Sequence, residues 1–290
     1  MMETKEKKGA AEGSRSMPKL RFPEFEGEWK KRFLGEVCNI KTGNKDTKDR
    51  IDDGRYPFYV RSNTIERINS YSFDGEAILT SGDGVGVGKI FHYINEKFDY
   101  HQRVYALTNF DVDYSGKYIY YIFSEKFYRR VLGLSAKNSV DSVRMDFISK
   151  MPINFPCLAE QQKIASFLSA VDEKINQLQR KKELLQAYKK GMMQQLFSQR
   201  LRFKNEDGND FPEWEEKKLG EVGEIVNGLT YSPNDIDDNG VIVLRSSNVK
   251  KRRIDLEDQV RVSVEKYNPV KTGDILICVR NGSKRLIGKN

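Results

Sequence analysis

The sequence predicts an α+β fold: a domain of mixed β-strands and helices, then a long coiled-coil-type helix, then a partial second copy of the first domain. Three observations support this prediction. The chain contains short β-rich runs bounded by turn residues, one uninterrupted stretch of helix-forming residues, and a long internal repeat. Its 290 residues allow roughly two domains of about 150 residues each.

The internal repeat defines the expected organisation. Residues 20–43 and residues 201–228 carry the same motifs in the same order, so that Trp29 recurs as Trp214 and Leu34–Val37 recurs as Leu219–Val222. The long period indicates duplicated domains, because solenoid repeats run to about 20–50 residues. Four segments are therefore expected: a disordered tail (1–19), a first domain (20–157), a spacer helix (158–199) and a second domain (200–290).

The first domain alternates short strands with turns. Runs dense in β-branched and aromatic residues, bounded by Asp, Gly and Asn, predict strands over residues 56–60, 77–80, 89–93 and 103–107. One helix interrupts them over residues 117–134. Its expected buried face consists of Ile119, Ile122, Phe123, Phe127, Val131 and Leu134, which follow the 3–4 spacing of an amphipathic helix.

The spacer helix over residues 158–199 contains no proline and a single glycine, Gly191. At 1.5 Å per residue it would form a rod of roughly 60 Å. Its apolar residues alternate between spacings of four and three, as in a heptad seam. The seam residues are Ile164, Leu168, Val171, Ile175, Leu178, Leu185, Met192 and Leu196. We expect another chain, or a matching helix after the second repeat, to cover this stripe; packing on its own domain is the alternative.

The second copy is expected to be incomplete. Its last match to the first copy is Gly288-Lys289, and nothing corresponds to residues 91–199. Its apolar runs at residues 241–244 and 275–277 predict strands. Such strands would be unstable or prone to aggregate unless something completes the domain.

Composition narrows the class of protein. Lys and Arg outnumber Asp and Glu by 50 to 42, which gives a net charge of +8 and favours an anionic partner, although a merely soluble basic protein is the alternative. Charged residues make up 32%, and no run approaches the ~18–20 apolar residues that span a bilayer. The N-terminus lacks the apolar core of a signal peptide. Three dispersed cysteines predict a reducing, cytoplasmic location, and with only two histidines no zinc site has a plausible spacing.

Motifs for catalysis or nucleotide binding are not found in the sequence. The glycine-rich run at residues 82–89 has Asp83 where a P-loop needs glycine and Ile90 where it needs Ser or Thr, so we interpret it as a hairpin next to a strand. Its backbone amides and Lys89 could contact a DNA phosphate. No histidine is placed to activate a Ser or Cys nucleophile. These patterns favour a binding protein over an enzyme.

Polar residues suited to reading DNA bases occur in three segments of the first copy. Arg and Lys pair with guanine, and Asn and Gln with adenine, in the major groove. The repetition of Arg61-Ser62 as Arg245-Ser246 makes that pair the best candidate, whereas solvated loops are the alternative for the others. The candidate DNA-binding residues are Lys41, Thr42, Asn44, Arg61, Ser62, Asn63, Lys89, His101, Gln102, Arg103, Arg245 and Ser246.

Taken together, three features resemble the specificity subunit of type I restriction-modification systems. They are the LRFPEFEGEW and LGEV motifs that open each repeat, the segment Pro156-Cys157-Leu158-Ala159-Glu160-Gln161-Gln162-Lys163-Ile164 that leads into a long helix, and the closing Gly191 with Gln194-Gln195-Leu196-Phe197. The resemblance covers residues 20–290.

This resemblance implies a non-catalytic subunit with two target-recognition domains, each of which reads one half of a split double-stranded DNA sequence. It also implies that the long helices act as a ruler and dock methylation (M) subunits, while a motor-nuclease (R) subunit completes the complex. S-adenosylmethionine, ATP and Mg are expected on those partner subunits and not on this chain. The early end of the second copy puts recognition of the second half-site in doubt.

The same sequence features fit other functions. The long helix could make the chain a coiled-coil dimerisation or scaffold protein, or an inactive truncated regulator without DNA specificity. A self-dimer through the helix would present two identical recognition domains to an inverted repeat. A methyltransferase or nuclease is disfavoured by the absent motifs.

Overall fold

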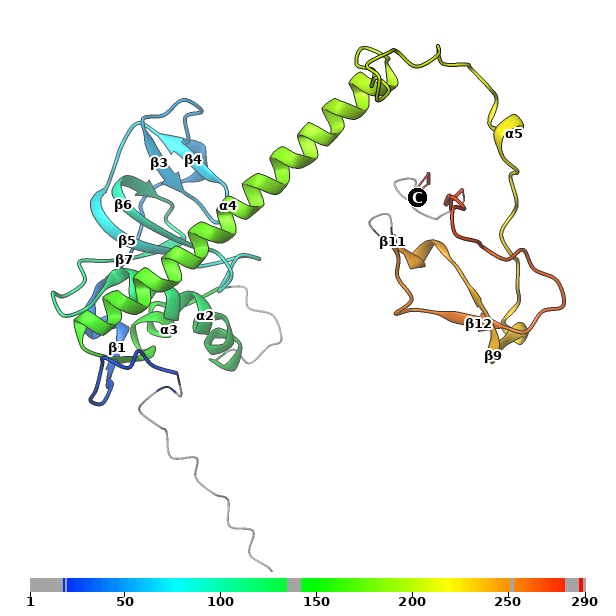
Figure 1. The fold of residues 1–290 in the computed structure, drawn as a ribbon. Helices are drawn as coiled ribbons and strands as arrows, with labels where there is room; N and C mark the ends of the chain where they lie inside the picture. The colour runs from blue at the N-terminus through cyan, green and yellow to red at the C-terminus, as the bar shows by residue number, and fades with distance from the viewer. Residues whose placement is uncertain (1–17, 19, 135–141, 251–252, 280–286, 289–290) are drawn as a thin grey trace, which may run out of the picture. The chain divides into compact units, whose positions relative to one another are not determined.

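The computed structural model describes residues 18, 20–134, 142–250, 253–279 and 287–288 (Figure 1). They fall into two compact units that divide between Ser198 and Gln199. Most of the expected tail lies outside the described residues, as does Lys289 of the repeat.

A six-stranded sheet forms the centre of the first unit, with the strand order β2-β7-β5-β6-β3-β4. All its pairs are antiparallel except β3 with β6, where Phe58 lies opposite Asp99. Its strands are β2 (Asn39–Thr42), β3 (Tyr56–Tyr59), β4 (Ile65–Ile68), β5 (Phe73–Ser81), β6 (Phe91–Tyr100) and β7 (Val104–Thr108). The strand expected over residues 89–93 begins two residues later, because the Lys89 and Ile90 amides bond to the Gly86 carbonyl in a turn.

A two-stranded ribbon and three helices cover one face of this sheet. Their bounds are β1 (Lys30–Phe33), α1 (Leu34–Val37), α2 (Gly116–Leu134), α3 (Met145–Ser149) and β8 (Pro152–Phe155), and a 3-10 turn, η1, spans Thr47–Asp49. β1 pairs antiparallel with β8, which is far away in the sequence. Alternating residues of β5 divide the core: Ile78 packs with the helices, whereas Ala77 and Leu79 face a second cluster that contains Tyr59 and Phe98.

The helix expected over residues 117–134 is confirmed as α2, and four of its six expected core residues, Ile119, Phe123, Phe127 and Val131, are fully buried. Ile122 is only half-buried. Leu134 is 49% exposed because it ends the helix, so its expected place in the core is wrong. Tyr118 is buried in the core instead, and its ring packs edge-on against Trp29.

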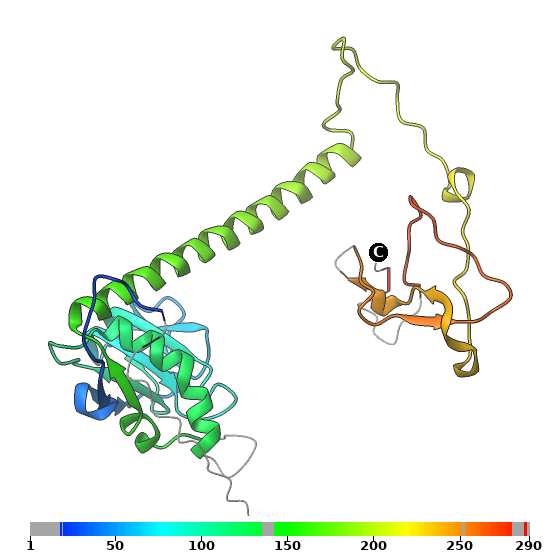
Figure 2. The ribbon, with the colours of Figure 1, turned by 60° about the horizontal axis from the view of Figure 1, so that its bottom comes forward.

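The long helix is confirmed as α4 (Leu158–Phe197). It starts beside β1 and α3, passes the sheet and continues beyond the rest of the first unit (Figures 1 and 2). Its first turn is anchored by side chains: both carboxylate oxygens of buried Glu160 accept hydrogen bonds from the Arg21 guanidinium, at 2.8 and 2.7 Å. This ion pair raises the pKa of Arg21.

Gln161 joins α4 to the loop that precedes α2. Its amide oxygen accepts a hydrogen bond from the Ser115 amide at 3.0 Å, and its amide nitrogen donates to the Asp113 and Pro156 carbonyls at 3.1 and 2.9 Å. The side chain is 1% exposed, so water cannot replace these partners. The glutamine therefore fixes the position at which the long helix leaves the domain.

Replacing Gln161 by alanine is expected to lower the free energy of unfolding of the first unit by about 2–3 kcal/mol, because three backbone groups lose their hydrogen bonds to this buried side chain. Urea unfolding followed by circular dichroism measures the change. The neighbouring Gln162→Ala is the matched control, since Gln162 is exposed. Equal losses in both variants would contradict the anchoring role of Gln161.

The second unit contains less regular structure. Its elements are α5 (Leu219–Val222), η2 (Pro233–Asp235), β9 (Ile236–Val243), η3 (Ser246–Asn248), β10 (Val249–Lys250), β11 (Arg253–Ile254) and β12 (Val260–Val262). β9 pairs with β12 and β10 with β11, both antiparallel. The expected strand over residues 241–244 lies in β9 except for Leu244, whereas residues 275–277 form no strand, with Ile275 78% exposed and Ile277 58% exposed. No helix among the described residues has both the length and the hydropathy that a bilayer-spanning segment needs.

Candidate nucleic-acid interface

The three polar segments of the first copy come together in the first unit. Thr42 at the end of β2 lies opposite Tyr105 in β7, and Val104 at the start of β7 lies opposite Ser81 at the end of β5. The ends of three neighbouring strands therefore meet. The Gln102 amide donates to the Lys45 carbonyl at 2.8 Å, which joins the loops that follow β2 and precede β7. We call the loops 43–46, 61–64, 82–89 and 101–103 the loop cluster.

Asp83 is the carboxylate at the centre of the loop cluster. Its Oδ1 accepts a hydrogen bond from Arg61 Nη1 at 3.0 Å, and its Oδ2 lies 3.7 Å from Arg103 Nε. The two arginine side chains are 46% and 66% exposed, whereas that of Asp83 is 23% exposed. The carboxylate thus holds two solvent-facing guanidinium groups beside each other, where each can still donate to an anion or a base edge.

Backbone packing supports this arrangement. The Gly82 amide donates to the Arg103 carbonyl at 2.8 Å, and the Val143 amide donates to the Gly82 carbonyl at 2.8 Å. A side chain at Gly43 would overlap the Tyr100 carbonyl, so only glycine permits this approach of β2 to the loop before β7. The loops are held against one another and are not independent surface turns.

His101 differs from the other candidates because it is only 3% exposed. Its Nδ1 accepts a hydrogen bond from the Arg103 amide at 3.0 Å, so the ring shapes the turn that presents Gln102 and Arg103. We therefore remove His101 from the base-contacting set. Gln102 is exposed, and its amide nitrogen donates to Asp46 at 3.2 Å.

Burial lowers the pKa of both histidines of the first unit, His92 and His101. His92 Nε2 lies 3.1 Å from the Ser62 carbonyl, beside the candidate loop. The histidines of the unfolded chain therefore bind protons more readily than those of the folded chain. The neutral rings contribute their full share to the stability of the folded unit above the unfolded pKa of about 6.5, and this share is lost as the pH falls below it.

The first unit is therefore expected to unfold at a lower urea concentration at pH 5.5 than at pH 7.5. The midpoint of urea unfolding across this range tests the prediction. The variant His92→Gln should reduce the difference between the two pH values, because it removes one of the two titrating rings. An unchanged difference would assign the pH dependence to other groups.

The remaining candidates of the first unit are at the surface. Lys41 and Thr42 are exposed on β2, Asn44 and Asn63 are exposed in loops, and Ser62 is half-buried. Ser62 donates from its hydroxyl to the Thr64 carbonyl at 3.1 Å. The exposed Lys89 ammonium lies over the Tyr128 ring, 5.2 Å from its centroid. These positions are compatible with the predicted DNA contacts, which stay predictions.

In the second unit, Arg245 and Ser246 lie at the start of η3. The Arg245 guanidinium donates to the Asp258 carbonyl at 2.8 Å and contacts the Asp258 carboxylate at 2.9 Å. An arginine held by an aspartate thus occurs in both units, although Asp258 and Asp83 come from different places in the repeat. Ser246 is half-buried.

A polar cleft of about 510 Å³ separates β6 and α2 from α4, and the contacts across it set the direction of the long helix. The Tyr121 hydroxyl donates to Asp172 at 2.7 Å and lies 3.1 Å from the Ser169 hydroxyl. On the same side, the Lys117 ammonium lies 3.9 Å from the centre of the Tyr93 ring. Burial lowers the pKa of Lys117. Sequence patterns did not reveal this cluster, because it depends on how α2 and α4 pack.

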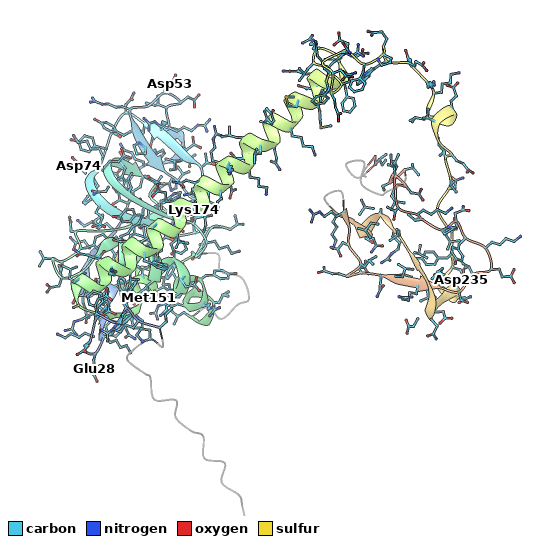
Figure 3. The ribbon with its side chains drawn as sticks, in the orientation of Figure 1. Glu28, Asp53, Asp74, Met151, Lys174 and Asp235 are labelled. Atoms are coloured by element: carbon cyan, nitrogen blue, oxygen red, sulfur yellow. The ribbon has the colours of Figure 1, made fainter. Side chains whose placement is uncertain are left out.

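The seam of α4 is largely uncovered within the first unit. Ile164 packs against the core, and Leu168, Met192 and Leu196 are half-buried. The central seam residues Val171, Ile175, Leu178 and Leu185 are 41%, 53%, 54% and 56% exposed. Asn176 and Gln177 still line the cleft beside the sheet, and past them α4 continues beyond the rest of the first unit (Figure 3). Only the first part of the helix packs on its own domain.

Asp83 is the residue that sequence reasoning missed. The sequence does contain a feature that could have indicated it, since Asp83 is an acidic residue in a glycine-rich turn of a basic chain. Its partners, however, precede and follow it in two other loops, so no sequence spacing indicates that they meet.

The chain is similar to known proteins in both sequence and fold. A family model described as "Type I restriction modification DNA specificity domain" matches residues 26–186. The chain is 28% identical to the type I restriction enzyme MjaVIII specificity subunit of Methanocaldococcus jannaschii, over 96% of this chain and 69% of that protein. It is 23% identical to the EcoDI specificity subunit of Escherichia coli, over 57% of this chain and 37% of that protein.

Among solved structures, the S subunit of a type I restriction-modification system from M. genitalium aligns with a TM-score of 0.51 and 21% identity. The match covers 62% of this chain and 48% of that one, and it supports the fold. The chain thus spans less than half the length of the EcoDI subunit and of the M. genitalium subunit.

Proposed function

Because this chain belongs to the family of type I restriction-modification DNA specificity domains, we propose that it is a DNA-recognition subunit whose first unit binds one half-site of a bipartite duplex. The observation that carries the proposal is the loop cluster, in which Asp83 holds Arg61 and Arg103 beside each other at the surface. A guanidinium group can donate two hydrogen bonds to the O6 and N7 acceptors of a guanine in the major groove, so two adjacent arginines suit neighbouring guanines.

The surrounding residues fit distinct parts of such an interface. Lys41 and Lys89 are exposed cations that can contact phosphates, which position the protein without reading the sequence. Asn44, Asn63 and Gln102 are exposed amides suited to adenine. Arg245 and Ser246 would belong to a second contact made by the second unit.

We further propose that the central seam of α4 docks a methylation subunit. An apolar stripe of this length is unfavourable in water, so a helical surface of complementary pattern is the partner it fits. S-adenosylmethionine, ATP and Mg would then reside on the methylation subunit and on a motor-nuclease subunit, and this chain would supply recognition without catalysis.

Self-association is the second candidate, and the exposed seam favours it too. Two chains paired through α4 would present two identical first units to an inverted repeat. Analytical ultracentrifugation tests this directly: a dimeric mass at micromolar concentration supports pairing, and a monomeric mass at that concentration rejects it.

Salt dependence tests DNA binding. If the first unit contacts four phosphates, its affinity for duplex DNA should fall on the order of 100-fold between 50 and 200 mM salt. Fluorescence anisotropy with a labelled duplex selected from a random pool by the purified chain provides the measurement. A chain that retains no DNA at 50 mM salt would point instead to a protein scaffold, and methyl transfer by the isolated chain would contradict the non-catalytic role.

A further inference from the structure

Val85 lies at the tip of the glycine-rich turn in the loop cluster, and its side chain is 96% exposed. A single exposed apolar side chain is ordinary on a protein surface. The tip of a tight turn, however, usually carries Gly, Asn, Asp or Ser, which fit the backbone of a turn and are compatible with water. Burial within the folded chain does not explain a β-branched apolar residue at this position.

The turn is fixed on both sides of its tip. Before the tip, the Ser81 hydroxyl donates to the Asp83 carbonyl at 2.8 Å. After the tip, the Val87 amide donates to the Gly84 carbonyl at 3.1 Å, and the Val87 side chain is buried in the core that the helices cover. Because the turn is already ordered, a contact made by Val85 would cost little conformational entropy.

The same turn places Val85 next to the paired arginines. Two residues earlier, Asp83 binds both Arg61 and Arg103 through its carboxylate. One residue later, a Cβ at Gly86 would lie 3.2 Å from the Arg61 carbonyl, so the backbone of the turn packs against that of Arg61. The exposed valine therefore belongs to the same surface as the two guanidinium groups.

The internal repeat keeps the frame of this turn and changes its tip. Residues 282–289 match residues 82–89 at the first glycine, at the last glycine and at the final lysine, but Arg285 replaces Val85. The tip residue thus changes from an apolar side chain to a cation within a frame that recurs. Such a position is where two copies of one recognition domain would differ in the base that they read.

We propose that Val85 contacts the C5-methyl group of a thymine in the major groove, within the half-site that Arg61 and Arg103 read. This inference rests on the proposed function of the first unit. Thymine is the one unmodified base that presents a methyl group in the major groove, and apolar side chains recognise it there. Contact between the valine and this methyl group removes apolar surface of both from water.

Replacing thymine by uracil tests the contact, because uracil lacks only the methyl group. The duplex is one that the full chain selects from a random pool, and each thymine of the half-site is replaced in turn. One of these replacements should lower the affinity about fourfold, which corresponds to about 0.8 kcal/mol for one buried methyl group. Fluorescence anisotropy at constant salt measures each affinity.

The variant Val85→Ala should lower the affinity for the thymine duplex severalfold and should abolish the effect of that uracil replacement. The fold should survive, since the side chain lies in solvent, and circular dichroism checks this. Val112→Ala is the matched control: Val112 is 90% exposed, and it follows β7, whereas the loop cluster precedes β7. This control should change neither the affinity nor the effect of uracil.

The proposal would be overturned by a selected half-site that contains no thymine, or by uracil replacements that leave the affinity unchanged. A uracil effect that persists undiminished in Val85→Ala would also overturn it. If Arg61→Ala/Arg103→Ala loses affinity while Val85→Ala does not, only the thymine contact is wrong and DNA recognition stands. A chain that selects no duplex would overturn both.

Discussion

Replacing Arg61 and Arg103 together by alanine is expected to lower the affinity of the chain for its selected duplex by roughly 100-fold or more, because two guanidinium contacts worth about 1–3 kcal/mol each are removed. The loss should be larger for the selected duplex than for a random one, since the arginines are proposed to read bases and not only phosphates. Anisotropy titrations at constant salt measure both affinities.

A matched control removes the same charge elsewhere. Lys30 and Lys31 are exposed on β1, which pairs with β8 and not with the six-stranded sheet. The double variant Lys30→Ala/Lys31→Ala should weaken binding to both duplexes far less. If the two double variants lose affinity equally, the net charge of the chain accounts for binding and the loop cluster does not.

A substitution at Asp83 distinguishes the positioning of the two arginines from the effect of net charge. Asp83→Asn removes the carboxylate that holds both arginines and adds one unit of positive charge, so affinity for random DNA should rise while discrimination between duplexes falls. A simple electrostatic role would instead raise both affinities by the same factor. The comparison also shows why the sequence alone could not identify Asp83: its effect depends on two loops that only the folded sheet brings to it.

The helices were predictable because their periodicity is local. The 3–4 spacing of Ile119, Phe123, Phe127 and Val131 marks the buried face of α2, and the absence of proline marks the length of α4. The pairing of β1 with β8 was not predictable, because the two strands are far apart in the sequence and neither has a strong pattern. That pairing buries Leu34 and Val37, and so decides which surface of the repeated motif is core.

The residues of the candidate site likewise include some that the sequence indicated and others that only the packing revealed. Residue types and the Arg-Ser repetition indicated Arg61 and Arg103, whereas the burial of His101 follows from the loop packing around Tyr59, whose carbonyl accepts from the His101 amide. A histidine between a glutamine and a strand looks the same in sequence whether it faces water or the core. The Lys117 cluster likewise depends on the angle between two helices.

The second large effect is expected on the seam of α4. Leu178→Asp/Leu185→Asp should weaken association through the helix at least 100-fold, because two apolar side chains worth about 1.5–3 kcal/mol each on burial are replaced by charges. Both positions are more than half exposed in the first unit, so the fold of the isolated chain should survive. Circular dichroism checks the fold, and co-purification with a methylation subunit or sedimentation checks association.

The control places the same charges on the opposite side of the helix. Ala187→Asp/Gln194→Asp lies on the exposed side away from the seam and should leave association unchanged. The seam also carries Lys182 and Lys189, which a parallel self-dimer in register would place opposite their own copies. Like charges facing each other disfavour that arrangement, so Lys182→Leu/Lys189→Leu should strengthen parallel self-association. A self-dimer that is no tighter after that change would contradict a parallel pairing in register.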